Sequence, residues 1–175
     1  MQAHRAGNDD RSELPAQLRV LVTDDNRDAA DSMATLCHIW GHEALVAYDG
    51  PSALRLLSAE PPDVVLADLA MPGFAGDWLA RELRAVPGGH YFTLVAVTGY
   101  ADTEYRKLAV AAGFDHYLVK PVEPSALAGL LADIQKKAHE TIDQTRALIG
   151  RTSELIGETR GLIAEARRLR GDAAN

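Results

Sequence analysis

Five short stretches of the chain have the hydrophobic pattern of buried β-strands, and segments with helical spacing lie between them. Residues 64–67 form an unbroken apolar run, which is typical of a central parallel strand covered on both faces. The other four apolar stretches cover residues 18–23, 43–47, 93–98 and 117–120. Strands that alternate with amphipathic helices predict a parallel sheet in the α/β class.

Between these strands, apolar residues recur at intervals of three and four, and turn residues end each run. The first helix is predicted over residues 27–40, where Cys37 falls on the apolar side and is expected in the core. The remaining helices are predicted from about residue 50, over residues 78–85, from the cap residue Asp102 to Gly113, and from Glu123 onward. The chain therefore contains five βα units.

The C-terminal part of the chain repeats every seven residues from Gln144. One row holds Leu148, Leu155, Leu162 and Leu169; the row three residues earlier holds Thr145, Thr152, Thr159 and Ala166; Ile149, Ile156 and Ile163 widen the stripe. This spacing is typical of a coiled coil, and such a helix needs a partner to bury its stripe. We expect residues 138–171 to form a homodimer. The second hypothesis is that they pair with a helix of another protein. Three glycines each weaken the helix by up to about 1 kcal/mol, so a tail that is partly frayed without its partner is the alternative.

Composition and charge narrow the function classes. The 175 residues are 47% hydrophobic and 25% charged, as in a globular domain with extensions. The net charge of −7 disfavours non-specific nucleic-acid binding, and we expect no DNA partner. A single cysteine excludes an internal disulfide, and no apolar run approaches the length of a membrane span. We therefore predict a cytoplasmic protein without a membrane segment, with residues 1–16 as a disordered leader.

Polar side chains stand where four of the predicted strands end. Asp24 and Asp25 follow the first strand, Asp68 ends the third, Thr98 ends the fourth and Lys120 ends the fifth. The carboxyl ends of parallel strands share one edge of the sheet, where ligands bind in open α/β folds. Three carboxylates there would repel each other, and Mg²⁺ with oxygen ligands would remove that conflict. These aspartates, the threonine and the lysine together suit phosphoryl transfer to an aspartate nucleophile. The alternative interpretation is that the acids belong to a solvated, Asp-rich loop.

Two other functions fit the sequence less well. An aspartate-nucleophile phosphatase or dehalogenase needs a second acid two residues after its nucleophile, and Ala70 stands there. His139 precedes Glu140 as in histidine kinases, but the proline-containing sequence that normally follows is missing. The other histidines lack metal-ligand spacing.

Residues 17–135 resemble the receiver domain of bacterial two-component response regulators. The resemblance rests on Asp24-Asp25, on Asp68 followed by Met71-Pro72-Gly73, on Thr98, and on Tyr117 with Lys120-Pro121. The segments 97–100 and 112–122 are similar to receivers of hybrid sensor kinases. The resemblance implies a flavodoxin-like, doubly wound five-stranded sheet of order 2-1-3-4-5, with an extended C-terminal helix. We expect the receiver domain over residues 17–137 and a helical tail over residues 138–175.

The resemblance also implies a role for each site residue. Asp68 would accept a phosphoryl group from a phosphohistidine on a sensor histidine kinase or a histidine phosphotransfer protein. Mg²⁺ would be held by Asp25, Asp68 and the backbone carbonyl of Ala70, and Asp24 would act through metal-bound water. Lys120 would pair with Asp68 at rest and with the phosphoryl group afterwards, next to a cis Lys120–Pro121 bond.

Thr98 and Tyr117 would form the switch, with Thr98 moving toward the phosphoryl group and Tyr117 turning inward. The chain would then be no conventional enzyme, but would catalyse its own Mg²⁺-dependent phosphorylation and autodephosphorylation. Two functions are compatible with this site. One is a switch that signals through protein–protein contact, and the alternative is a phosphorelay intermediate that passes the phosphate to a histidine. The sequence departs from the commonest family pattern at Gly99, where alanine or serine is more usual, and at residues 74–76, where an acid usually precedes the glycine.

Overall fold

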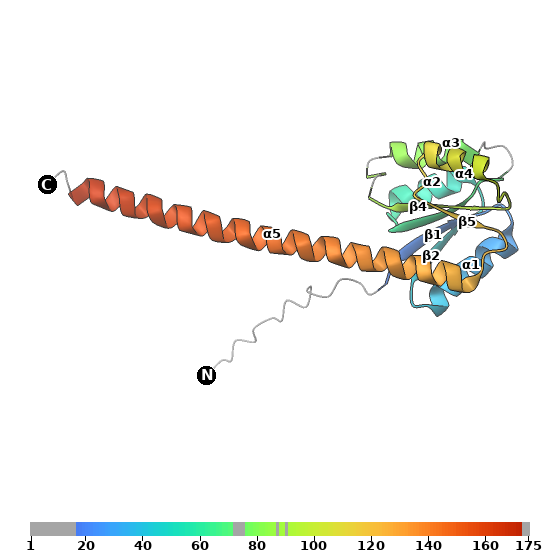
Figure 1. Cartoon of the computed structure of the whole chain (residues 1–175), viewed down its shortest axis with the longest axis horizontal. Coiled ribbons are helices and arrows are strands. Elements are labelled where there is room, and N and C mark those ends of the chain that lie inside the picture. The colour runs from blue at the N-terminus through green and yellow to red at the C-terminus, as the bar shows by residue number, and fades with distance from the viewer. Residues whose placement is uncertain (1–16, 72–75, 87, 90, 173–175) are drawn as a thin grey trace. The chain divides into compact units, whose positions relative to one another are not determined.

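The chain folds around a five-stranded parallel sheet of order β2-β1-β3-β4-β5, which confirms the predicted fold class (Figure 1). The computed structural model describes residues 17–71, 76–86, 88–89 and 91–172, so the predicted disordered leader, residues 1–16, lies outside the described residues. The strands are β1 (Arg19–Thr23), β2 (Glu43–Ala47), β3 (Val64–Asp68), β4 (Thr93–Thr98) and β5 (His116–Val119). The helices are α1 (Arg27–Ile39), α2 (Gly50–Ala59), α3 (Gly76–Ala85), α4 (Thr103–Ala112) and α5 (Pro124–Asp172).

Burial falls from the centre of the sheet to its edges. All five residues of β3 are buried, whereas β2 and β5 at the edges are mostly half-buried. In the register of the sheet, Thr23 lies beside Ala67, and Asp68 lies beside Val97. Strands β1, β3 and β4 therefore end at the same edge, and this alignment positions the polar residues that follow them.

The sheet separates two hydrophobic cores (Figure 1). Helices α2, α3 and α4 cover one face, where Leu79 and Leu83 of α3 are buried. Helix α1 and the first turns of α5 cover the other face, where Leu127 and Leu131 are fully buried. Cys37 of α1 is completely buried in this second core, as expected, and burial raises the pKa of its thiol to about 11.

The helix ends follow local capping chemistry. The Asp102 side chain accepts hydrogen bonds from the backbone amides of Glu104 and Tyr105, which confirms the predicted cap of α4. Gly113 ends α4 in the left-handed conformation, at φ 105°, which favours glycine. Helix α1 ends one residue earlier than predicted, and α3 begins two residues earlier.

The Arg84 side chain joins three segments of the fold, and the sequence analysis did not predict these contacts. Its guanidinium donates to the carbonyl oxygens of Gly89, Phe92 and Gly113 at 2.7–3.0 Å and contacts the Asp115 carboxylate at 2.5 Å. A Cβ atom at Gly89 would lie 2.5 Å from the Arg84 carbonyl oxygen, so only glycine fits there. These hydrogen bonds and the ion pair of Arg84 hold α3 against the turns that lead into β4 and β5.

The chain divides into two compact units, residues 1–135 and 136–175. The described part of the second unit is the remainder of α5, and its leucine and isoleucine side chains from Leu148 to Ile163 are exposed. None of the helices in the described ranges combines the length and the apolar composition that a membrane-spanning segment requires.

Candidate functional site

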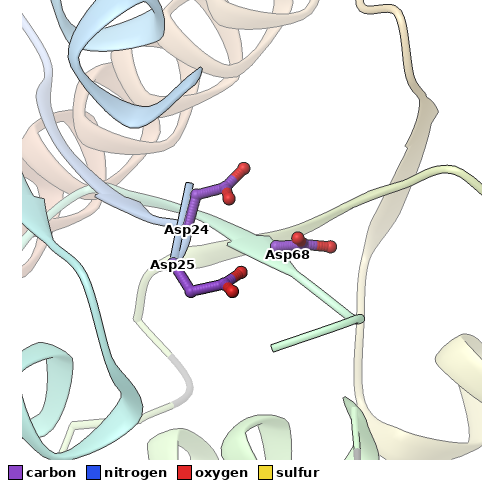
Figure 2. A group of neighbouring side chains, drawn as sticks. All are labelled: Asp24, Asp25 and Asp68. Atoms are coloured by element: carbon purple, nitrogen blue, oxygen red, sulfur yellow. The ribbon is translucent and has the colours of Figure 1, made fainter. Parts of the chain in front are cut away.

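Three carboxylates meet at the edge of the sheet where the strands end (Figure 2). Asp24 and Asp25 follow β1, Asp68 ends β3, and one oxygen from each lies within 4.8 Å of the others. Asp24 is completely buried and Asp68 is 7% exposed, whereas Asp25 is exposed. The structure therefore brings together the three acids that the sequence singled out, with one side open to solvent.

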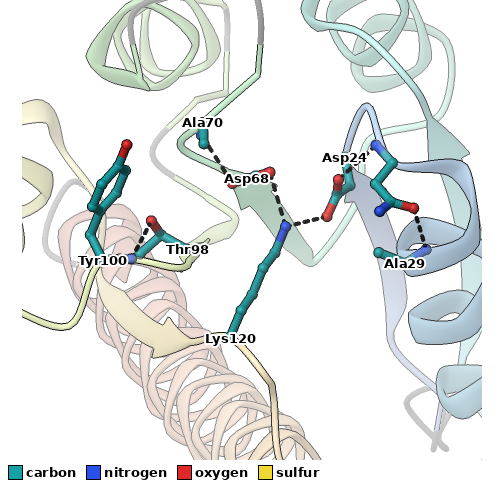
Figure 3. Close-up of polar contacts among 8 residues, drawn as sticks. Asp24, Ala29, Asp68, Ala70, Thr98, Tyr100 and Lys120 are labelled. Atoms are coloured by element: carbon teal, nitrogen blue, oxygen red, sulfur yellow. Dashed lines mark hydrogen bonds and ion pairs between the residues drawn. The ribbon is translucent and has the colours of Figure 1, made fainter.

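Lys120 bridges the two buried carboxylates (Figure 3). Its Nζ atom lies 2.7 Å from Oδ2 of Asp24 and 2.9 Å from Oδ2 of Asp68. Burial alone would lower the pKa of Lys120, but the hydrogen bonds and charges of Asp24 and Asp68 outweigh burial, and the pKa is raised. The ammonium therefore stays charged at neutral pH. The Asp68 contact agrees with the sequence analysis, whereas the direct contact with Asp24 was not predicted.

Backbone geometry holds Lys120 in this position. The residue follows β5, and its amide donates to the carbonyl oxygen of Thr98 at 2.7 Å. The Lys120–Pro121 peptide bond is cis, as the resemblance implied.

The other oxygen of each buried carboxylate accepts a backbone hydrogen bond. Oδ1 of Asp68 accepts from the Ala70 amide at 3.0 Å, and Oδ1 of Asp24 accepts from the Asn26 amide at 2.9 Å. The Asn26 side chain in turn caps α1 by accepting from the Ala29 amide. An asparagine just before an apolar helical run is a known N-cap signal, and it was available in the sequence. These hydrogen bonds hold both carboxylates in fixed orientations.

Thr98 and Tyr117 meet at the backbone of Tyr100, which the sequence analysis did not single out as a link between them. The buried Thr98 hydroxyl accepts from the Tyr100 amide at 3.2 Å (Figure 3), and the Tyr117 hydroxyl donates to the Tyr100 carbonyl oxygen. The Tyr100 ring stacks on Tyr105 of α4, with centroids 4.3 Å apart. Burial, followed by the nearby charge of Asp102, raises the pKa of Tyr117. This network connects the end of β4 to β5 and α4.

The charge balance of the site suits a hard divalent cation. Among the described side chains at this edge, three carboxylates lie near the single ammonium of Lys120, which contacts Asp24 and Asp68, so acidic groups are in excess. Oxygen ligands of this kind, next to a solvent-exposed side, are what Mg²⁺ prefers. The residues present therefore fit Mg²⁺.

Residues 20–132 match the sequence model of the response regulator receiver domain, which covers more than half of the chain. The chain therefore belongs to the receiver domain family of two-component signalling. Receiver domains are phosphorylated by histidine kinases or phosphotransfer proteins and bind Mg²⁺ at an acidic pocket.

Individual relatives agree with this assignment. An uncharacterised 14.6 kDa protein of Leptolyngbya boryana is 37% identical over 116 residues, which cover 66% of this chain and 88% of that protein. The DNA-binding response regulator MtrA of Mycolicibacterium paratuberculosis is 35% identical over 109 residues, which cover 62% of this chain but 47% of MtrA. The match to MtrA thus spans about half of that protein's length.

Solved structures show the same architecture. The chemotaxis protein CheY4 of Vibrio cholerae superimposes with a TM-score of 0.65 at 25% identity, covering 68% of this chain and 99% of CheY4. The receiver domain of the Francisella response regulator 1452 gives a TM-score of 0.64 at 28% identity, covering 70% of this chain and 99% of that domain.

Proposed function

We propose that Asp68 accepts a phosphoryl group from a phosphohistidine on a partner protein. The observation that carries this proposal is the Lys120 ammonium, which lies 2.9 Å from the Asp68 carboxylate at the end of the central strand. Asp68 also has its second oxygen held by the Ala70 amide, so the nucleophile is fixed before a donor arrives. The exposed side of the site at Asp25 gives a phosphohistidine access.

The chemistry follows from these contacts. A carboxylate oxygen of Asp68 forms a bond to phosphorus while the phosphorus–nitrogen bond of the donor breaks, and the electron pair leaves with the imidazole, which takes up a proton. Lys120 is already directed at the Asp68 carboxylate and would neutralise negative charge on the transferred group. Thr98 would exchange its contact with the Tyr100 amide for a phosphoryl oxygen.

Mg²⁺ would be held by Asp25, Asp68 and the backbone carbonyl of Ala70, with Asp24 acting through bound water. The cation supplies electrostatic stabilisation of the phosphoryl oxygens. Asp24 has a second function in this proposal, because its contact with Lys120 positions the ammonium.

The experiment uses phosphoramidate, a small phosphorus–nitrogen donor, with and without Mg²⁺. We expect the natural chain to gain one phosphoryl group that hydroxylamine removes, as it removes an acyl phosphate. D68N should gain none, while the matched surface variant D63N should behave like the natural chain. A label that survives hydroxylamine, or that D68N still acquires, would overturn the assignment. If the label then passes to a histidine phosphotransfer protein faster than it hydrolyses, the chain acts as a phosphorelay intermediate.

We further propose that residues 17–137 act as the receiver and that residues 138–175 form a tail that self-associates. The tail exposes six leucine and isoleucine side chains between Leu148 and Ile163, each 48–67% exposed. Burying one of them contributes on the order of 1 kcal/mol, or roughly 12 kcal/mol in a dimer. This gain is similar in size to the cost of association, about 4–15 kcal/mol. We therefore expect a reversible dimer whose population depends on concentration.

Light scattering on the full chain tests this proposal. The natural chain should shift from monomer to dimer as its concentration rises, and a chain with L148Q and L155Q should stay monomeric. The matched control R146Q/E154Q changes polar positions of the same turns and should still dimerise. A natural chain that is monomeric at every concentration would overturn the self-association and leave a foreign helix as the partner.

A further inference from the structure

The exposed stripe of the tail alternates small and large side chains in a regular order. Thr145, Thr152 and Thr159 occupy one seam position, and Leu148, Leu155 and Leu162 occupy the other. The three leucines are 62–67% exposed. An isoleucine directly follows each leucine and widens the stripe on one flank. A partner helix must therefore fit a seam in which every second position is short.

The threonine hydroxyls already have hydrogen-bond partners within the helix. The hydroxyl of Thr145 donates to the carbonyl oxygen of Thr141 at 2.8 Å, and that of Thr152 donates to Leu148 at 2.9 Å. Thr159 donates to Leu155 at 2.8 Å in the same way. Because these hydroxyls are satisfied, the threonines can be covered without leaving an unpaired polar group.

The alternation of size distinguishes the two orientations of a helix pair. In a parallel, in-register pair each seam residue meets its own copy, so thin Thr–Thr layers would alternate with thick Leu–Leu layers. In an antiparallel pair each threonine meets a leucine, and every layer has a similar volume. Close packing favours layers of even volume, because voids lose dispersion contacts.

We propose that the tails of two copies pair antiparallel about a two-fold axis between Ser153 and Glu154. Thr152 then lies opposite Leu155 of the second copy, and Thr145 lies opposite Leu162 of the second copy. This inference rests on the self-association of the tail in the proposed function and adds its orientation and register.

The side chains that flank the seam agree with this arrangement. On one flank, Ile149 lies opposite Ile156 of the second copy, so the isoleucines extend the apolar contact. On the other flank, Arg151 lies opposite Glu158 of the second copy. The two-fold axis repeats each contact, which gives two ion pairs and two isoleucine pairs.

Charge also selects the register. Shifting one helix along the other by seven residues in one direction brings Arg151 opposite Arg151 of the second copy. The same shift in the other direction brings Glu158 opposite Glu158 of the second copy. In a parallel pair, Arg151 lies beside Ile156 of the second copy and gains no ion pair. The proposed register gives two attractions between the described residues of this flank without a like-charge contact.

A charge-exchange series on the full chain tests the orientation. R151E and E158R each turn both ion pairs into repulsions and should weaken self-association roughly tenfold, by sedimentation equilibrium. The double variant R151E/E158R should return to within about twofold of the natural chain. Mixing the two single variants should give heterodimers in preference to either homodimer. Equal affinities throughout the series would overturn the proposed pairing.

Disulfide cross-linking separates orientation from self-association. T145C and L162C variants, distinguished by a tag, should form a disulfide with each other and not with their own kind. The natural chain is the control, because its buried Cys37 should give no cross-link. A dimer in which T145C cross-links to itself would overturn the antiparallel arrangement and leave the self-association standing. A monomeric mass with no cross-link would overturn both.

Discussion

The replacement of Lys120 by methionine tests how the site is held together. The ammonium is 28% exposed and contacts two carboxylates that are 0% and 7% exposed, so K120M leaves two buried anions without a cation. Breaking a buried ion pair typically costs about 3–5 kcal/mol. Because water reaches the site beside the exposed Asp25, we expect the lower end, about 3 kcal/mol of unfolding free energy at pH 7.5. That loss corresponds to a melting temperature lowered by roughly 10 °C.

The pH dependence of this loss gives the prediction a second readout. The pKa of Lys120 is raised in the folded chain. The natural chain therefore keeps this stabilisation at any pH below the pKa of lysine in the unfolded chain, and loses it only as the pH rises through the pKa of Lys120 in the folded chain. K120M lacks this stabilisation at every pH, so its deficit relative to the natural chain should shrink as the pH rises above 10.5, where the lysine of the natural chain begins to lose its proton. Millimolar Mg²⁺ should also stabilise K120M more than the natural chain, because it supplies the missing cation.

The assay is urea unfolding followed by the fluorescence of Trp40 and Trp78, which both lie in the receiver. The matched control is K107M, whose ammonium is 70% exposed and lies 3.6 Å from Glu104. It should change the unfolding free energy by less than about 0.5 kcal/mol. If K120M proves as stable as K107M, or if its deficit in unfolding free energy is independent of pH, then Lys120 does not stabilise the two buried carboxylates.

Three further predictions concern the rest of the receiver. R84M should lower the unfolding free energy by about 3 kcal/mol in the same assay, because the carbonyl oxygens that Arg84 clamps lose a charged donor; an unchanged midpoint would contradict this. Burial lowers the pKa of His42 from 6.5. The natural chain should therefore lose stability as the pH falls below about 6.5, because the unfolded histidine takes up a proton there and the folded one does not. In H42Q the unfolding free energy should no longer show this dependence on pH. The Cys37 thiol should react with a thiol reagent only as fast as the receiver unfolds, and rapid modification of the folded chain would contradict its complete burial.

Much of the receiver could be predicted because hydrophobic periodicity reports burial directly. The unbroken run before Asp68 identified the central strand, and polar residues at strand ends identified one edge of the sheet. Asp24, Asp25 and Asp68 then had to meet, since parallel strands end together. The boundaries of α1 and α3 were off by one or two residues, because helix ends depend on caps and neighbouring turns as well as on periodicity.

Contacts that depend on main-chain groups or on distant side chains could not be predicted in this way. Arg84 binds carbonyl oxygens, which every residue carries, so no sequence pattern marks its partners. The ring of His42 accepts a hydrogen bond from the backbone amide of Leu18, and no sequence pattern indicates this contact, because every residue except proline carries such an amide. The contact between Lys120 and Asp24 joins residues 96 positions apart, and only the folded sheet shows that the two side chains touch directly.

We propose that Asp68 receives the phosphoryl group, and mapping the modified residue within the sequence tests this assignment. The phosphorylated chain is reduced with borohydride, which converts an aspartyl phosphate to homoserine, and its peptides are mapped by mass spectrometry. We predict homoserine at position 68 and unchanged aspartates at positions 24 and 25. Homoserine at either of those neighbours, or a phosphoryl group retained on a serine, threonine or histidine, would show that Asp68 is not the phosphoryl acceptor.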